Sequence, residues 1–121
     1  MSAAPPLAAV LGWPIGHSRS PALHGHWLHR YGIPGHYVPV AVPPDGLGNA
    51  LAALASLGFR GCNVTLPHKE AALSGAVSAS AAARAIGSAN TLTFRDDGGY
   101  DSDNTDAYGF LENLRAGAPH W

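Results

Sequence analysis

Short apolar runs alternate with segments of helix character along the 121 residues, and this alternation limits the fold more than any other feature. Strands that alternate with helices favour a parallel sheet covered by helices. Further along the chain, the residues Asp96-Asp97-Gly98-Gly99 separate two strand-like runs and predict a hairpin. We therefore predict an α/β fold with a mostly parallel open sheet, helices on both faces and one antiparallel hairpin strand.

Glycine, proline and capping residues set the expected limits of the elements. Ser20 before Pro21 marks a helix start, and Gly32 marks its end. The predicted strands cover residues 7–11, 36–42, 59–64, 88–95 and a returning run from residue 100, and the predicted helices cover residues 21–32, 47–57, 67–73, 78–86 and a segment through residues 108–114.

Composition excludes several classes of function. The net charge of −1 leaves no basic surface that would bind nucleic acid or an anionic membrane. The single cysteine, Cys62, excludes an internal disulfide and a cysteine-built metal site, and its apolar neighbours place it in the core. No apolar run approaches the roughly 20 residues that span a bilayer. We expect a cytoplasmic protein without nucleic-acid or membrane partners. Whether the chain forms a homodimer is left open by the sequence.

The junction from Asn63 to Glu70 is the first candidate for chemistry. An apolar run ends there in polar residues, and Pro67 then fits the first turn of a helix. Open α/β sheets bind ligands at the carboxyl ends of their strands. Lys69 is the only lysine, beside six arginines, and lysine can exchange a proton where arginine effectively cannot. Lys69 is therefore a candidate acid or base, and the alternative is an exposed helix lysine.

Three more groups of polar residues occupy comparable positions. Ser18 and Ser20 flank the start of the first predicted helix, where two hydroxyls and free N–H groups suit a carboxylate or phosphate. The alternative, that Ser20 only caps its helix, stays open. Asn90 with Thr91 and Asn104 with Asp106 form the other two groups. Strand ends in a covered sheet can converge on one crevice, and these polar groups would suit a small polyhydroxylated acid.

Other readings of the motifs are weaker. Gly16-His17-Ser18-Arg19-Ser20 lacks the last glycine of a nucleophile elbow. His24 and His26 would point about 200° apart on a helix, so they are not expected to share a metal ion, and we expect His24, His26 and His29 on the surface. No Gly-x-Gly-x-x-Gly turn follows any predicted strand, which leaves nucleotide binding by these residues unsupported.

Four blocks of sequence carry a resemblance that covers nearly the whole chain, in the family's order and spacing. In these blocks the chain resembles the N-terminal substrate-binding domain of the shikimate dehydrogenases. The blocks are Gly12–Pro21, Gly61–Glu70, Ile86–Thr91 and Asp103–Asp106 with Gly109-Phe110.

The resemblance implies roles for individual residues. Ser18 and Ser20 would bind the carboxylate of the substrate. Lys69 and Asp106 would be the catalytic pair, and a carboxylate beside a lysine favours its charged form, which helps an acid and hinders a base. The ring hydroxyls would be held by Asn63, Thr65, Asn90 and Asp106.

The resemblance also implies an organisation and an activity. Residues 1–117 would be the shikimate-binding catalytic domain, and residues 118–121 would begin a linker to an NADP-binding domain. The complete enzyme would interconvert shikimate and 3-dehydroshikimate with NADP, in the pathway to aromatic amino acids, whereas this chain alone would be inactive. Two alternatives remain: a quinate or quinate/shikimate dehydrogenase, and a non-catalytic module that binds shikimate or quinate.

Overall fold

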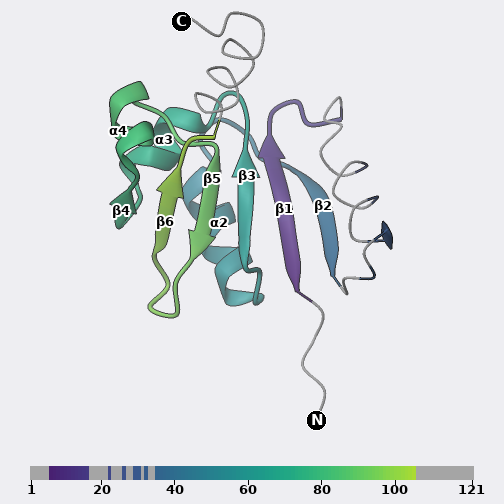
Figure 1. The fold of residues 1–121 in the computed structure, drawn as a ribbon. Coiled ribbons are helices and arrows are strands. Elements are labelled where there is room, and N and C mark those ends of the chain that lie inside the picture. Colours follow the sequence, from purple (N-terminus) through teal and green to yellow (C-terminus); the bar gives the residue numbers. More distant parts are fainter. Residues whose placement is uncertain are drawn as a thin grey trace, which may run out of the picture.

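The structure, a computed structural model, describes residues 6–16, 22, 26, 29–30, 32 and 35–105. A six-stranded sheet in the order β2-β1-β3-β5-β6-β4 forms its centre (Figure 1). The strands are β1 (Leu7–Gly12), β2 (His36–Ala41), β3 (Gly61–Val64), β4 (Ser78–Ala79), β5 (Thr91–Phe94) and β6 (Tyr100–Asp103).

The direction of the strands agrees with the prediction. β1 pairs in parallel with β2 and β3, and β4 pairs in parallel with β6. β5 alone runs the other way, antiparallel to β3 on one side and to β6 on the other. The predicted mostly parallel sheet with one antiparallel hairpin strand is confirmed.

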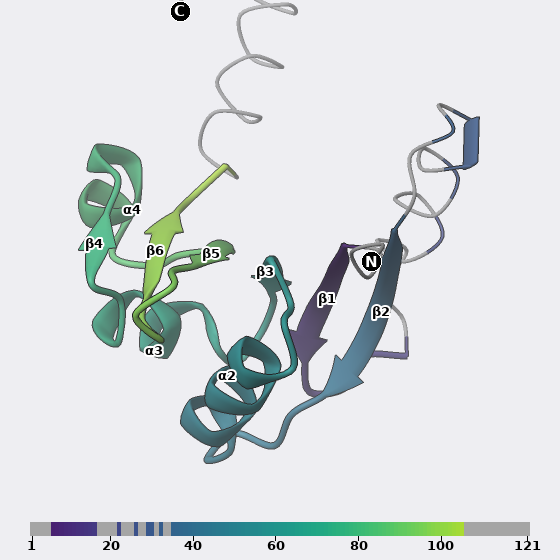
Figure 2. The same ribbon diagram turned by 90° about the horizontal axis from the view of Figure 1, so that it is seen from below.

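Three helices are described in full: α2 (Leu47–Ser56), α3 (Lys69–Ser74) and α4 (Ala81–Ile86). Figure 2 shows α2 and α3 on the same side of the sheet. In the first predicted helix, Ala22, His26 and His29 have helical geometry, and Gly32 takes a φ of 63°, which suits a helix end. The other residues of that helix, and the helix expected through residues 108–114, lie outside the described residues.

The core lies between the sheet and its two covering helices. Alternate residues of β1 and β3, such as Leu11 and Val64, point to this side and are almost fully buried. Cys62 lies among them at 4% exposure, so its predicted place in the core is confirmed. The helices contribute Leu47, Leu51, Leu54 and Ala72.

Two helices begin later than predicted. The helix predicted from Pro67 begins at Lys69, because a turn occupies the residues before it. The helix predicted from Ser78 begins at Ala81, because the Ser80 hydroxyl caps it by accepting the Ala83 N–H at 3.1 Å. Ser78 and Ala79 form β4 instead, paired with β6.

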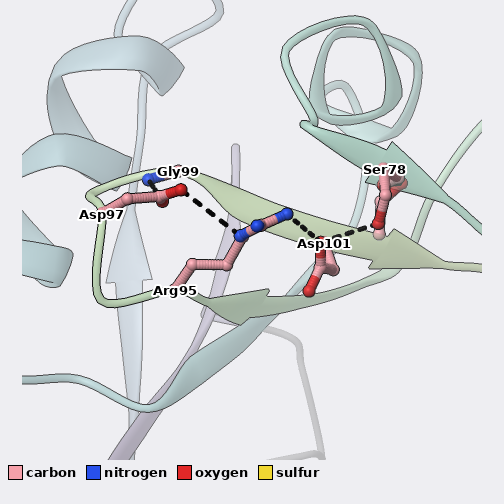
Figure 3. Close-up of polar contacts among 6 residues, drawn as sticks. Ser78, Arg95, Asp97, Gly99 and Asp101 are labelled. Atoms are coloured by element: carbon pink, nitrogen blue, oxygen red, sulfur yellow. Dashed lines mark hydrogen bonds and ion pairs between the residues drawn. The ribbon is translucent and has the colours of Figure 1, made fainter.

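Polar side chains hold the short edge strand β4 against β6. The Ser78 hydroxyl donates to Asp101 Oδ1 at 2.6 Å, and Arg95 Nη1 reaches the same oxygen at 3.3 Å (Figure 3). Arg95 also pairs with Asp97 in the hairpin turn, at 3.5 Å. These groups are solvent-exposed, so each ion pair contributes only about 0–1 kcal/mol to stability.

β2 is the outermost described strand at the other edge of the sheet. The backbone N–H groups of His36 and Val42 point to β1, where they bond Pro6 O and Gly12 O at 3.0 Å. Backbone groups alternate in direction along a parallel strand, so Pro39, three residues after His36, points its backbone nitrogen away from β1.

Gly61 and Gly48 allow a matched test of the sheet's packing. A Cβ at Gly61 would collide with the Leu92 carbonyl oxygen, whereas a Cβ at Gly48, in α2, would meet nothing within 4 Å. We expect Gly61→Ala to lower the free energy of unfolding by about 1–3 kcal/mol, through overpacking. Gly48→Ala should raise it by about 0.5–1 kcal/mol, through helix propensity. Urea unfolding of both variants measures this, and a shift of the same sign in both would contradict the packing described.

Candidate functional site

The strand β3 carries the first two predicted site residues to the edge where β1 also ends. Asn63 lies within β3, and Thr65 follows it directly. The Thr65 N–H bonds Leu11 O at 2.9 Å, which continues the pairing with β1 past the end of the strand. The Thr65 methyl lies close above Gly12, where a Cβ would approach it to 2.5 Å. The backbone and the methyl of Thr65 are therefore both fixed by β1.

A tight turn leads from Thr65 to Lys69. The His68 N–H bonds Thr65 O at 3.0 Å, and the Leu66–Pro67 peptide is cis. The His68 ring is 1% exposed, and its Nε2 lies 2.6 Å from Val42 O. Because a carbonyl oxygen only accepts, Nε2 carries the proton. The His68 ring thus ties the turn to the end of β2 by a buried, long-range hydrogen bond.

Lys69 is the first residue of α3, whereas the predicted helix began two residues earlier at Pro67. Its carbonyl accepts the Ala89 N–H at 2.9 Å, which brings the approach to β5 against the start of α3. Its side chain is partly buried. The sequence block that contains Asn90 therefore lies beside the block that contains Lys69.

A network of hydrogen bonds joins Asn63 to Asn90. Asn63 Nδ2 donates to Asn90 O at 3.3 Å and to Thr91 Oγ1 at 3.2 Å. The Thr91 hydroxyl donates in turn to Asn90 Oδ1 at 2.9 Å. On its other side, Asn63 Oδ1 accepts the Tyr37 hydroxyl at 2.8 Å. The network spans β2, β3 and β5 on the face opposite the helical core.

Asn90 also holds the chain just before Asp106. Its Nδ2 donates to Thr105 Oγ1 at 2.9 Å, and its Oδ1 accepts the Thr105 N–H at 3.0 Å. Asn104 Nδ2 donates to Ser88 O at 2.9 Å and supports the same pairing. The third and fourth sequence blocks therefore meet at Asn90.

The structure brings together four of the predicted site residues, Asn63, Thr65, Lys69 and Asn90. The other three, Ser18, Ser20 and Asp106, lie outside the described residues. Two members of the network, Tyr37 and Thr105, were not predicted. Thr105 stands inside a sequence block already singled out, whereas Tyr37 could be connected to Asn63 only through the register of β2, β1 and β3.

Tyr37, Asn63 and Thr91 line a shallow depression of about 310 Å³ on this face of the sheet. A larger cavity of about 900 Å³ lies between the C-terminal part of α2 and the hairpin of β5 and β6. None of the four described site residues lines the larger cavity. Of the four, only Asn63 lines the smaller depression, so the polar network meets this depression through Tyr37, Asn63 and Thr91.

Ionisable groups of the core are kept neutral. Burial raises the pKa of the Cys62 thiol to about 12, so the thiol stays protonated at neutral pH and is not a nucleophile. Burial also raises the pKa of Tyr100, with a smaller effect of Cys62, and the Tyr100 hydroxyl donates to Ala72 O at 2.7 Å. Both groups are structural.

The described residues contain no group of three side chains that could hold a metal ion. His26 and His29 are exposed, in agreement with their predicted place on the surface, and His24 lies outside the described residues.

Within the described ranges, no helix is both long enough and apolar enough to cross a membrane. No described strand is followed by a glycine-rich dinucleotide turn, so these residues do not fit NADP.

Solved structures share this fold. A shikimate 5-dehydrogenase from Thermus thermophilus, in complex with NADP(H) and shikimate, superposes with a TM-score of 0.84 at 43% identity, over 93% of this chain and 42% of that one. The shikimate dehydrogenase from Aquifex aeolicus superposes with a TM-score of 0.89 at 31% identity, over 98% of this chain and 44% of that one.

Curated relatives are similar over nearly the whole chain. The shikimate dehydrogenase (NADP(+)) of Paracoccus denitrificans is 57% identical over 116 residues, which are 96% of this chain and 41% of the relative. The chain thus spans about two fifths of the length of such relatives. The family model described as the shikimate dehydrogenase substrate binding domain matches residues 10–92. On this match, the chain belongs to the family of shikimate dehydrogenase substrate-binding domains.

Proposed function

We propose that this chain is the substrate-binding part of an NADP-dependent shikimate dehydrogenase that interconverts shikimate and 3-dehydroshikimate. One observation carries the proposal: hydrogen bonds connect three separate sequence blocks around one strand edge. Val64 N–H and Asn63 Nδ2 both bond Asn90 O, Ala89 N–H bonds Lys69 O, and Asn90 Nδ2 donates to Thr105 Oγ1. Polar groups from β3, α3 and the start of β5 are thereby held together, beside the depression on the sheet.

The gathered side chains suit a substrate with several hydroxyl groups. Asn63, Thr65 and Asn90 supply neutral amide and hydroxyl groups, which can each accept and donate hydrogen bonds. We propose that these three, with Asp106, hold the ring hydroxyls, and that Ser18 and Ser20 hold the carboxylate. Supporting this, the Thermus thermophilus structure of the same fold contains shikimate.

Lys69 is proposed to move the proton. When a secondary alcohol is oxidised, its carbinol carbon loses a hydride and its hydroxyl loses a proton. Lys69 would accept that proton in oxidation and return it to the carbonyl oxygen in reduction, with Asp106 hydrogen-bonded to the same hydroxyl. Lys69 lies at the start of α3, directly after the turn fixed by His68, so its backbone is held firmly in place.

NADP would be bound by the part of the protein that corresponds to the remaining three fifths of the relatives, where it would supply the hydride acceptor. The Paracoccus denitrificans relative is named for NADP(+). A quinate or quinate/shikimate dehydrogenase and a non-catalytic binding module are the competing functions. Assays of the full-length protein with shikimate and with quinate, each with NADP and with NAD, distinguish them.

Substitution of Lys69 tests its proposed role in the full-length enzyme. Lys69→Ala should lower kcat by about 10²–10⁴-fold while the KM for shikimate changes little, because general acid–base catalysis contributes on that scale. Lys69→Arg should recover little of the rate, since arginine keeps the charge but cannot exchange the proton near neutral pH. Steady-state kinetics measure both. A near-normal kcat in Lys69→Arg would show that the residue acts only through its charge.

Thr65→Val should affect binding instead of the rate. Valine keeps the methyl that lies above Gly12 and removes only the hydroxyl. The loss of one hydrogen bond to the substrate is worth about 0.5–1.5 kcal/mol, so the KM should rise about two- to twelvefold with kcat nearly unchanged. If kcat falls and KM stays constant, Thr65 takes part in the chemical step and not in substrate binding.

A further inference from the structure

The Tyr37 hydroxyl reaches Asn63 across an intervening strand. Tyr37 lies in β2 opposite Ala8 of β1, and Ala8 lies opposite Gly61 of β3. These two small residues leave room on the sheet's face, and all three line the depression next to Asn63. The hydroxyl donates to Asn63 Oδ1 at 2.8 Å. A long-range contact thus joins an edge strand to a proposed binding residue.

The direction of each hydrogen bond at Asn63 follows from its partners. The Asn90 carbonyl can only accept, so the atom of the Asn63 amide that lies 3.3 Å from it is the nitrogen. The same nitrogen donates its second hydrogen to Thr91 Oγ1 at 3.2 Å. Oδ1 is therefore the atom that faces Tyr37, and the Tyr37 hydroxyl must donate to it.

This arrangement decides what Asn63 can offer to a ligand. Both amide hydrogens already have protein acceptors, and Oδ1 has two lone pairs, of which the Tyr37 hydroxyl uses one. The hydrogen-bonding capacity that remains at Asn63 is the second lone pair of Oδ1, which can accept a hydrogen bond. A ligand group that donates, such as a hydroxyl, matches it, whereas a carboxylate or carbonyl oxygen does not.

We propose that Tyr37 is a positioning residue, which orients the Asn63 amide so that Oδ1 accepts a hydrogen bond from a hydroxyl of the substrate. Tyr37 acts through Asn63 and does not touch the reacting atoms. Without its hydroxyl, the Asn63 amide is held only through its two Nδ2 hydrogen bonds, and the position of Oδ1 is less firmly fixed. The proposal rests on the proposed function for the identity of the substrate, but the geometry at Asn63 stands independently of it.

Tyr37→Phe tests the proposal in the full-length protein, because phenylalanine keeps the ring and removes only the hydroxyl. We expect the KM for shikimate to rise about three- to tenfold, with kcat within about twofold of the wild type, on the scale of one lost hydrogen bond. Ser56→Ala is the control, since the Ser56 hydroxyl donates to Ala53 O within α2, outside the depression, and it should leave both constants unchanged.

A double-substitution cycle separates positioning from a role of Tyr37 on its own. In an Asn63→Ala background, Tyr37→Phe should raise the KM no further, because the residue through which Tyr37 acts is gone. The same increase in both backgrounds, or no increase in the wild-type background, would overturn the proposal.

A second measurement does not depend on catalysis. In protein labelled with ¹⁵N-asparagine, the side-chain NH₂ signals of Asn63 are identified by their loss in Asn63→Ala. Tyr37→Phe should shift these signals, and Thr93→Val, which removes another hydroxyl that lines the depression, should not. If the wild-type protein fails to turn over shikimate, the proposed function is wrong. The positioning role of Tyr37 is then tested by the Asn63 NH₂ signals alone. Unshifted signals in Tyr37→Phe would refute it.

Discussion

The reversed direction of β5 is the constraint on which the candidate site depends. In a wholly parallel sheet, the residue that precedes a strand lies at the opposite edge from the residue that follows its neighbour. Because β5 runs antiparallel to β3, Asn90, just before β5, lies beside Asn63 and Val64 at the end of β3. β6 then runs back and ends at the same edge, next to Asn104 and Thr105. One hairpin therefore brings two further chain segments, one before β5 and one after β6, to the site.

The Asn90 carbonyl shows how the fold and the site share the same groups. It accepts the Val64 N–H at 2.9 Å and thereby extends the pairing of β3 with the chain that enters β5. It also accepts Asn63 Nδ2, so that, with the Tyr37 hydroxyl bonded to Oδ1, both sides of that amide are held. A backbone group that is needed for folding thus also fixes the polarity of a binding group, so the site requires little reorganisation beyond what the sheet already imposes.

Much of the fold could be predicted from the sequence, because the signals were local. Proline, glycine and apolar runs located β1, β2, α2 and β3 to within two residues, and the turn at residues 96–99 located the hairpin. The short edge strand β4 could not be predicted, since two residues carry no periodicity and its pairing with Asp101 and Ser102 is a long-range contact. The start of α3 was wrong for a related reason: the turn before it is held by the buried bond from His68 to Val42.

The same distinction applies to the site. Asn63, Thr65, Lys69 and Asn90 stand in recognisable sequence blocks, whereas Tyr37 is an ordinary strand tyrosine until the register of three strands brings it to Asn63. Tyr37 can reach Asn63 because Ala8 and Gly61, the residues between them on the sheet, are small. No single segment of sequence reveals this arrangement.

Pro39 has a consequence for how copies of this chain can meet. Its nitrogen points outward from β2, the outermost described strand on that side, and proline has no N–H to offer there. A strand from another molecule that approached this edge would find the ladder of donors interrupted at its middle. Growth of the sheet from one molecule to the next is thereby disfavoured at this edge.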